Sequence, residues 1–191
     1  MDHDIIFVAG PQGSGKGTQG KRLAEKLGFL FWEMGGTLRA ILAEGGPLAG
    51  KIRAIDHGKL LDDDLIIEIL REKLPLIPRG SGVIFDGVPR RIRQSEFMIG
   101  WWRDRGKEGR MATVFIDLSR DECKRRLLAR AEIEGRADDT PEAIDQRFRD
   151  FDDEIHAAME YLKDHTRFIT IDGAPAPDVV AAEIQAALGI E

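Results

Sequence analysis

A chain of 191 residues has room for one compact domain with small inserted segments. Hydrophobic residues make up 42% of the sequence and charged residues 32%, a balance that excludes a disordered chain. The formal net charge of -6 argues against non-specific binding to nucleic acids, so no nucleic-acid partner is expected.

The apolar runs and the cysteine content bear on the cellular setting. No apolar run approaches the roughly 20 residues of a membrane-spanning helix, so no membrane partner is expected. The acidic start, residues 1–4, leads directly into a strand-like run and does not resemble a signal peptide. The single cysteine, Cys123, cannot form an internal disulfide. These features predict a reducing, cytoplasmic setting.

The first predicted elements are a strand, a glycine-rich loop, a helix and a second strand. Ile5–Val8 is a short continuous apolar run, typical of a strand that is buried on both faces in a parallel sheet. The spacing of the leucines predicts a helix over Lys16–Leu27, which Gly28 ends. Phe29–Trp32 is the candidate second strand.

The segment from Met34 to about Asp62 has a different character. Its two helical patches, Leu38–Ala43 and Lys51–His57, are interrupted by helix breakers. The breakers are Gly35-Gly36, Gly45-Gly46-Pro47 and Gly50. We therefore expect a small helical flap rather than a layer of the core. An amphipathic helix is predicted next, over Asp62–Leu74.

Strand and helix patterns alternate through the second half of the chain. Buried strands are predicted at Val83–Asp86, Val114–Ile116 and Phe168–Ile171. Helices are predicted over Gln94–Arg105, Asp121–Ala131, Pro141 to about Lys163, and Val179–Leu188. The third of these has a strong start signal, because a threonine cap precedes the proline. The alternation predicts an α/β fold with a parallel five-stranded sheet flanked by helices.

The segment Gly10–Thr18 has the sequence and the context of a phosphate-binding loop. It lies between a predicted buried strand and a predicted helix, as such a loop requires. Its glycines let backbone N–H groups point at phosphate oxygens, and the helix presents its positive N-terminal end. Lys16 supplies a mobile charge for the β- and γ-phosphates, and Thr18 is placed to support Mg²⁺. The candidate ATP ligands are Gly13, Ser14, Gly15, Lys16, Gly17 and Thr18.

Gly17, which separates the lysine from the threonine, narrows the choice of family. Gly-Ser-Gly-Lys-Gly-Thr-Gln, at residues 13–19, resembles the phosphate loop of adenylate kinases and related nucleoside monophosphate kinases. Further motifs follow in the order of that family. They are Gly35-x-x-Leu38-Arg39, Gly58-Lys59-Leu60-Leu61-Asp62-Asp63, Phe85-Asp86-Gly87-Val88-Pro89-Arg90 with Gln94, Arg126-Leu127-Leu128-Ala129-Arg130, Gly135-Arg136-Ala137-Asp138-Asp139, and Glu142-Ala143-Ile144 with Arg147. The resemblance covers essentially the whole chain.

The resemblance implies a role for each matching residue. Arg39 and Arg90 hold the phosphate of the acceptor, and Arg126 lies on the adenine face of ATP. The residues implied to act at the transferring phosphoryl group are Lys16, Arg90, Arg130, Arg136 and Arg147. Asp86 and Thr18 hold Mg²⁺, Asp86 through water. No general base is needed, because the acceptor phosphate is already anionic.

The resemblance also divides the chain into parts of a P-loop NTPase fold. The core comprises residues 1–33, 64–130 and 138–191, the monophosphate-binding flap residues 34–63, and the short lid residues 131–137. The lid contains no cysteine, so the zinc-bearing lid of some relatives is not expected. The resemblance suggests a monomer whose partners are the small molecules ATP and AMP.

The flap departs from the pattern of the family, which reads Ser-Thr-Gly-Asp before Leu-Arg. Here Met34 replaces the expected hydroxyl and Gly36 replaces the expected acid. Met34 can pack on a purine face, and the Gln94 amide can read an adenine edge, so AMP is the favoured acceptor. The predicted AMP site comprises Arg39, Arg90, Gln94, Met34 and Gly35. The alternatives are a kinase of another monophosphate, such as UMP, CMP or dAMP, and a non-catalytic nucleotide-binding regulator.

Overall fold

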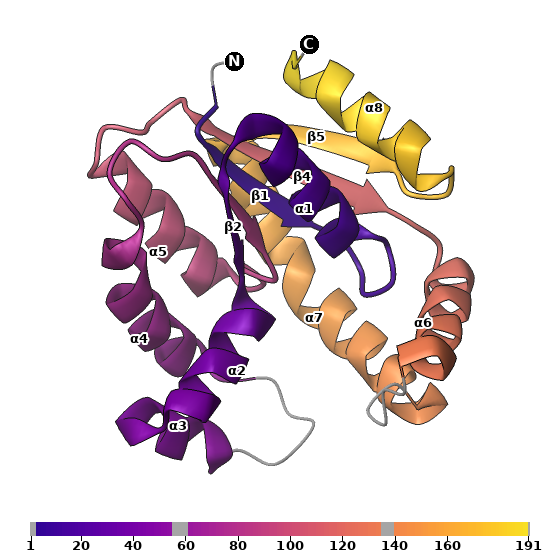
Figure 1. The fold of residues 1–191 in the computed structure, drawn as a ribbon, viewed down its shortest axis with the longest axis horizontal. Helices are drawn as coiled ribbons and strands as arrows, with labels where there is room; N and C mark the ends of the chain where they lie inside the picture. The colour runs from indigo at the N-terminus through magenta and orange to yellow at the C-terminus, as the bar shows by residue number, and fades with distance from the viewer. Residues whose placement is uncertain (1–2, 55–60, 135–139, 191) are drawn as a thin grey trace.

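The computed structural model describes residues 3–54, 61–134 and 140–190, with the backbone alone at 133–134, 143, 146–147 and 150–154. Its centre is a parallel sheet of five strands in the order β2-β3-β1-β4-β5, with helices on both faces (Figure 1). The strands are β1 Ile5–Ala9, β2 Leu30–Glu33, β3 Val83–Asp86, β4 Met111–Asp117 and β5 Arg167–Asp172. The helices are α1 Lys16–Leu27, α2 Met34–Glu44, α3 Gly46–Arg53, α4 Asp63–Lys73, α5 Ile92–Arg103, α6 Arg120–Glu134, α7 Pro141–His165 and α8 Pro177–Leu188, with a short 3₁₀ helix at Leu74–Leu76. This architecture confirms the predicted fold class.

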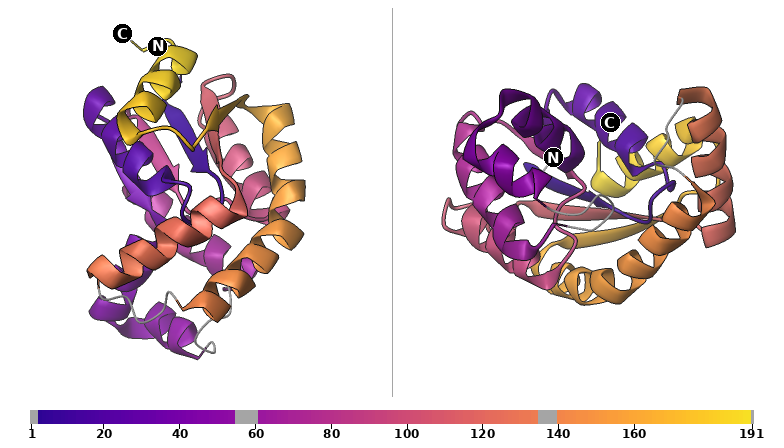
Figure 2. Two further views of the ribbon diagram at one scale, coloured as in Figure 1. Left: turned by 90° about the vertical axis from the view of Figure 1, so that its right-hand side faces the viewer. Right: turned by 90° about the horizontal axis from the view of Figure 1, so that it is seen from below.

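The two faces of the sheet are covered by different helices because successive strand residues point to opposite sides. In β1, Phe7 packs in the apolar cluster that includes residues of α4, α5 and α7. Its neighbours Ile6 and Val8 pack with residues of α1 and α8. Figure 2 shows these layers from two further directions, with α1 and α8 on one side of the strands and α7 on the other. Burial on both faces explains why the strands read as continuous apolar runs.

Helices α2 and α3 lie beyond one end of the sheet and have a small core of their own (Figure 1). Ile41 of α2 and Leu48 of α3 pack against Leu65 and Ile69 of α4. This arrangement joins the segment to the main body through α4. The division into core, flap and lid stays a prediction.

The prediction that Gly35-Gly36 interrupts a helix is wrong. Helix α2 begins at Met34 and runs through both glycines. The two glycines leave space that the side chains of Glu33 and Arg39 occupy. The helix therefore forms despite the low helix propensity of glycine, with the side chains of two sequence neighbours packed against these positions.

The second predicted patch of this segment is also displaced. Helix α3 spans Gly46–Arg53, whereas the pattern predicted Lys51–His57. Proline fits the first turn of a helix, so Pro47 belongs to the start of α3 rather than to a break. Gly45, with a φ of 80°, ends α2. His57 lies outside the described residues.

The other predicted elements lie close to their observed positions, with two differences that matter. Strand β4 begins at Met111, because Met111 and Ala112 pair with β1 and are buried. Helix α6 continues to Glu134, so residues 131–134 of the predicted lid are helical and the rest lies outside the described residues. In the described ranges, no helix is long and apolar enough to cross a membrane.

Candidate active site

The carboxyl ends of the parallel strands surround a pocket with a volume of about 940 Å³. In sheets of this kind, ligands bind outside the carboxyl ends of the strands. The walls come from residues 12–19 and Lys21, from Glu33, Gly35 and Arg39, from Asp86, Gly87 and Arg90, from Glu122, residues 125–127 and Arg130, and from residues 173–177 and Val180. Basic side chains outnumber acidic ones in this lining, so the pocket favours an anionic ligand.

The phosphate loop is held against α6 by a close backbone contact. At Gly13, where φ is +87°, a Cβ atom would lie 2.6 Å from the carbonyl oxygen of Cys123. At Gly15, the N-cap of α1, φ is +94° and no side chain caps the helix. The backbone N–H groups of the first turn are therefore open toward the pocket, which is the arrangement that binds phosphate groups.

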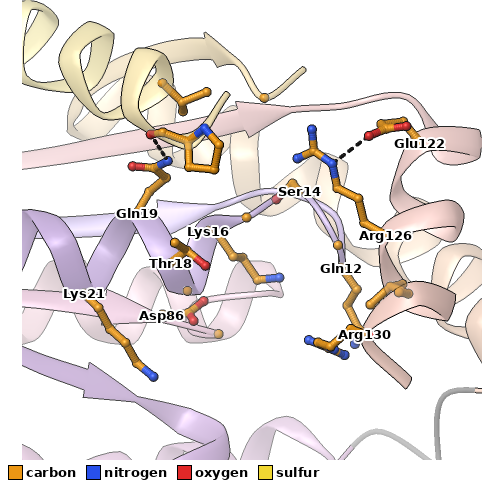
Figure 3. Close-up of a pocket in the computed structure, with 18 of the residues that line it drawn as sticks. Gln12, Ser14, Lys16, Thr18, Gln19, Lys21, Asp86, Glu122, Arg126 and Arg130 are labelled. Atoms are coloured by element: carbon orange, nitrogen blue, oxygen red, sulfur yellow. Dashed lines mark hydrogen bonds and ion pairs between the residues drawn. The ribbon is translucent and has the colours of Figure 1, made fainter. Parts of the chain in front are cut away.

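Lys16 and Asp86 lie next to each other at the loop (Figure 3). The Lys16 ammonium donates a hydrogen bond to the carbonyl oxygen of Pro11 at 3.3 Å. Burial lowers the pKa of Lys16, and the charge of Asp86 opposes that shift. Burial raises the pKa of Asp86 from its ordinary value, and the charge of Lys16 opposes that shift. Each group thus compensates part of the cost of burying the other.

Asp86 lies close to the backbone of Gly17. A Cβ atom at Gly17 would lie 3.1 Å from Oδ2 of Asp86. The other carboxylate oxygen, Oδ1, is buried and has no hydrogen-bond partner among the described residues. Thr18 follows in the first turn of α1 and is exposed. A buried carboxylate oxygen that lacks a donor, beside a phosphate loop, fits a hydrated Mg²⁺ ion.

Arg90 and Arg39 line the side of the pocket that faces β2 and β3. Arg90 follows a turn in which Gly87 has a φ of +83° and the Val88–Pro89 peptide bond is cis. The backbone N–H of Arg90 donates to Oε1 of Gln94 at 2.9 Å, which ties the turn to α5. Arg39, one turn into α2, is exposed and pairs with Glu33 at 3.4 Å.

Two residues of the predicted AMP site do not line this pocket. Met34 is 4% exposed and packs in the main core. Its Cβ lies beside Gly87. Gln94 is also 4% exposed, and its Nε2 donates to Oδ1 of Asp63 at 2.8 Å. A base could reach the Gln94 amide only by exchanging these hydrogen bonds. The contacts of Met34 and Gln94 with an acceptor stay predictions.

On the opposite side, Arg126 joins α6 to the loop that follows β5. Its Nε donates to Oε1 of Glu122 at 2.8 Å, and its Nη2 donates to the carbonyl oxygen of Ala174 at 3.2 Å. Arg130 projects into the pocket from the same helix (Figure 3). Hydrogen bonds from Arg125 and Arg126 lower the pKa of Glu122 to about 2. Glu122 is therefore ionised whenever the protein is folded near neutral pH.

The loop after β5 is packed tightly against the end of β4. The Gly173 N–H donates to the carbonyl oxygen of Asp117 at 2.7 Å. A Cβ atom at Gly173 would lie 2.8 Å from Cγ2 of Ile116. Gln19 of α1 donates from Nε2 to the carbonyl oxygen of Pro177 at 2.8 Å (Figure 3). The loop is thus held from two sides at a fixed distance from Arg126.

The structure brings most of the predicted site residues into this one pocket. They are Gly13, Ser14, Gly15, Lys16, Gly17, Thr18, Gly35, Arg39, Asp86, Arg90, Arg126 and Arg130. Arg136 and the side chain of Arg147 lie outside what the structure describes.

Sequence reasoning missed several residues of the lining. Lys21 lies three residues after Thr18, and this spacing on the same helical face was a signal for it. The loop at residues 173–177 follows the carboxyl end of a predicted strand, where parallel sheets bind their ligands. Glu33 and Glu122 carried no comparable signal, because an isolated acid on a helix or strand is usually solvated.

Comparisons with known proteins agree with this geometry. The family described as "Adenylate kinase" matches residues 8–167. The adenylate kinase of Thermus thermophilus is 39% identical over 187 residues, which cover 97% of both chains. The adenylate kinase of Phocaeicola vulgatus is 37% identical over 186 residues, covering 96% of this chain and 97% of the relative. An adenylate kinase of Stenotrophomonas maltophilia is 35% identical over 184 residues, covering 96% of this chain and 98% of the relative.

Proposed function

The chain belongs to the adenylate kinase family, and from this premise we propose that it transfers the γ-phosphoryl group of ATP to AMP, giving two ADP. One observation carries the proposal. Basic side chains that follow β2 and β3, and basic side chains of α6, line one continuous pocket around the phosphate loop. Two nucleotides whose phosphates meet at that loop would use both sets of basic residues at once.

ATP is the proposed occupant of the side formed by α6 and residues 173–177. Its triphosphate would accept hydrogen bonds from the loop backbone at Gly13–Gly15 and an ion pair from Lys16. Its adenine would stack on the face of the Arg126 guanidinium, beside the loop at Ala174 to which Arg126 donates a hydrogen bond. A planar guanidinium that is already held by Glu122 is well suited to stack on a base.

The acceptor monophosphate is proposed to occupy the side formed by β2, α2 and β3. Arg39 and Arg90 would bind its phosphate, because a guanidinium binds phosphate through two parallel hydrogen bonds. Gly35 lets the side chains of Glu33 and Arg39 lie close to the start of α2, beside the proposed acceptor phosphate. Met34 and Gln94 would shape this subsite from behind, since both side chains are buried next to it.

The site fits a mechanism of alignment and charge neutralisation. Lys16, Arg90 and Arg130 would hold the transferring group between donor and acceptor oxygens. Asp86 and Thr18 would hold Mg²⁺, Asp86 through water, and the ion supplies positive charge to the β- and γ-phosphates. The acceptor oxygen needs no general base, because the phosphate is already ionised.

Arg136 and Arg147 are proposed to complete the site from the lid and from α7. Both belong to motifs that resemble the family pattern, and Arg147 follows Thr140, whose carbonyl accepts the hydrogen bond that starts α7. Their approach would exclude water, which is the competing acceptor for the phosphoryl group.

A coupled assay with a panel of monophosphates tests the function. With Mg²⁺ and ATP, we expect rapid ADP formation with AMP and much slower turnover with UMP, CMP and dAMP. Faster turnover with another monophosphate would assign that acceptor instead. If calorimetry shows ATP binding but no acceptor is turned over, the result would favour a non-catalytic nucleotide-binding regulator instead.

Two arginine-to-lysine variants show whether the activity belongs to this pocket. Arg90→Lys should lose most of kcat/KM, because an ammonium cannot replace a two-point guanidinium contact. Arg103→Lys is the matched control, since Arg103 is exposed at the end of α5. It should keep the wild-type kcat/KM.

A further inference from the structure

Glu33 occupies the space that an acid at position 36 would need. The family pattern has serine at the position of Glu33 and aspartate at the position of Gly36. In this chain the acid and the small residue are exchanged. A Cβ atom at Gly35 would lie 3.3 Å from Oε1 of Glu33, and one at Gly36 would lie 3.3 Å from Oε2. The carboxylate of Glu33 therefore lies over the bare surface of both glycines.

The partner of this carboxylate is Arg39. Its Nη2 donates to Oε1 of Glu33 at 3.4 Å and to Oε2 at 3.5 Å. The guanidinium lies over the same glycines, with Nη1 3.3 Å from the Cβ position of Gly35. Arg39 is 68% exposed, so without this pairing its long side chain would sample many rotamers. The pair restricts the guanidinium to the mouth of the acceptor side of the pocket.

The stability of the fold does not explain why an acid stands at position 33. Exposed ion pairs contribute little to stability, and this one is long. Glu33 also lines a pocket that favours anions, and it is the register partner of Asp86 on the neighbouring strand. Its negative charge is one cause of the raised pKa of Asp86. An acid with this electrostatic cost at the site points to a role in the site.

We propose that Glu33 is a positioning residue for Arg39, and that it supplies from the end of β2 the carboxylate that the family pattern places in the first turn of α2. The proposal rests on the proposed function, because Arg39 is there assigned to the acceptor phosphate. The Glu33 carboxylate already lies beside both glycines. Aspartate added at position 36 would contact Oε2 of Glu33 and place two like charges beside one arginine.

A double-variant cycle tests this exchange. The four proteins are the wild type, Glu33→Ser, Gly36→Asp and the double variant Glu33→Ser/Gly36→Asp. Each single variant should raise the KM for AMP roughly five- to tenfold, with smaller changes in kcat and in the KM for ATP. The double variant restores the family pattern and should return the KM for AMP to within about threefold of the wild type. AMP affinity from calorimetry should follow the same order.

Glu44→Ser is the matched control for removing a carboxylate from this part of the chain. Glu44 is exposed at the far end of α2, 3.9 Å from Lys73. It should leave the KM for AMP unchanged. Thermal unfolding of all variants separates a loss of folding from a loss of acceptor binding, and the double variant stays informative even if one single variant folds poorly.

Two results would overturn the inference. Additive effects, with the double variant worse than either single variant, would show that positions 33 and 36 act independently. Equal increases in the KM values for AMP and ATP would show a general distortion rather than loss of the Arg39 position. If the wild type is active, either of these results overturns only the inference about Glu33. If the wild type neither binds nor turns over a monophosphate, the proposed function is overturned as well.

Discussion

At position 17 a side chain would crowd the Asp86 carboxylate, which lies in the adjacent space. The carboxylate lies 3.1 Å from where a Cβ atom would stand. Asp86 comes from β3 and Gly17 from the first turn of α1, so two distant segments meet at this contact. Glycine weakens a helix, but at this position it lets the carboxylate lie close to the phosphate loop.

Gly17→Ala is therefore expected to weaken Mg²⁺-dependent binding of ATP. The added methyl group would push the Asp86 carboxylate away from the ion, although alanine favours the helix by about 1 kcal/mol. Calorimetry with and without Mg²⁺ measures the effect, and the enhancement by Mg²⁺ should shrink at least severalfold. Gly50→Ala is the control, because a Cβ there meets nothing within 4 Å. Wild-type Mg²⁺ dependence in Gly17→Ala would contradict this account of the glycine.

At the scale of elements, one face of α6 carries three residues that line the pocket at a spacing of four. Glu122, Arg126 and Arg130 project from successive turns. Glu122 holds Arg126, which in turn reaches the loop after β5. Through this chain of contacts a helix and a loop that are far apart in sequence form one wall of the proposed ATP subsite.

Glu122→Ala should raise the KM for ATP roughly three- to tenfold and change the KM for AMP much less, because Arg126 loses the partner that orients it. Steady-state kinetics with each nucleotide varied in turn measures the two constants. Glu160→Ala, which removes an exposed partner of Lys163 on α7, should leave both unchanged. An unchanged or lower KM for ATP in Glu122→Ala would mean that the acid repels the nucleotide more than it orients the arginine.

At the scale of the whole molecule, the site is maintained at a cost in stability. Asp86 has a pKa raised mainly by burial, so its ionisation is less favourable in the folded chain than in the unfolded chain. Below about pH 4, the ordinary range of an aspartate, the carboxyl group is protonated and the contribution of Asp86 to the stability of the fold is fully present. That contribution is lost as the pH rises through the pKa of Asp86 in the folded protein. Above that range the burial of this carboxyl group therefore opposes folding, and the charge of Lys16 offsets only part of the cost.

Asp86→Asn should raise the unfolding temperature near pH 7 in the absence of nucleotide and Mg²⁺. The gain should shrink toward zero as the pH falls below about 4, where the carboxyl group is protonated in both states. Thermal unfolding across a pH series measures this dependence. A gain that is the same at every pH, or a lower unfolding temperature at pH 7, would contradict it.

Asp4→Asn is a control for which the expected change in unfolding temperature has the opposite sign. A hydrogen bond from Arg110, with further help from Lys107, lowers the pKa of Asp4 to about 2. The stability that Asp4 contributes is present above about pH 4 and is lost as the pH falls toward 2. Asp4→Asn should therefore lower the unfolding temperature at pH 7, and the loss should shrink in acid.

The order of strands and helices along the chain could be predicted from the sequence. Buried parallel strands appear as apolar runs, and the helices show apolar residues at helical spacing. The sequence was also sufficient for the phosphate loop, whose glycines and lysine are contiguous. It was insufficient at Gly35-Gly36, where the helix forms despite the low helix propensity of glycine, with Glu33 and Arg39 packed against these positions. Two further features depend on packing between distant segments, which local patterns do not contain. They are the burial of Met34 and the presence of residues 173–177 in the lining of the pocket.

The strand order also sets a length. Neighbouring strands lie about 4.8 Å apart, so β2 and β5, four spacings from each other, are separated by roughly 19 Å. Glu33 ends β2 on one side of this span, and Ala174 follows β5 on the other. Main-chain hydrogen bonds between neighbouring strands resist a change in that width. If the two proposed nucleotides bind on the two sides of this span, a movement that brings their phosphates together should therefore involve the helices around the sheet rather than the sheet itself.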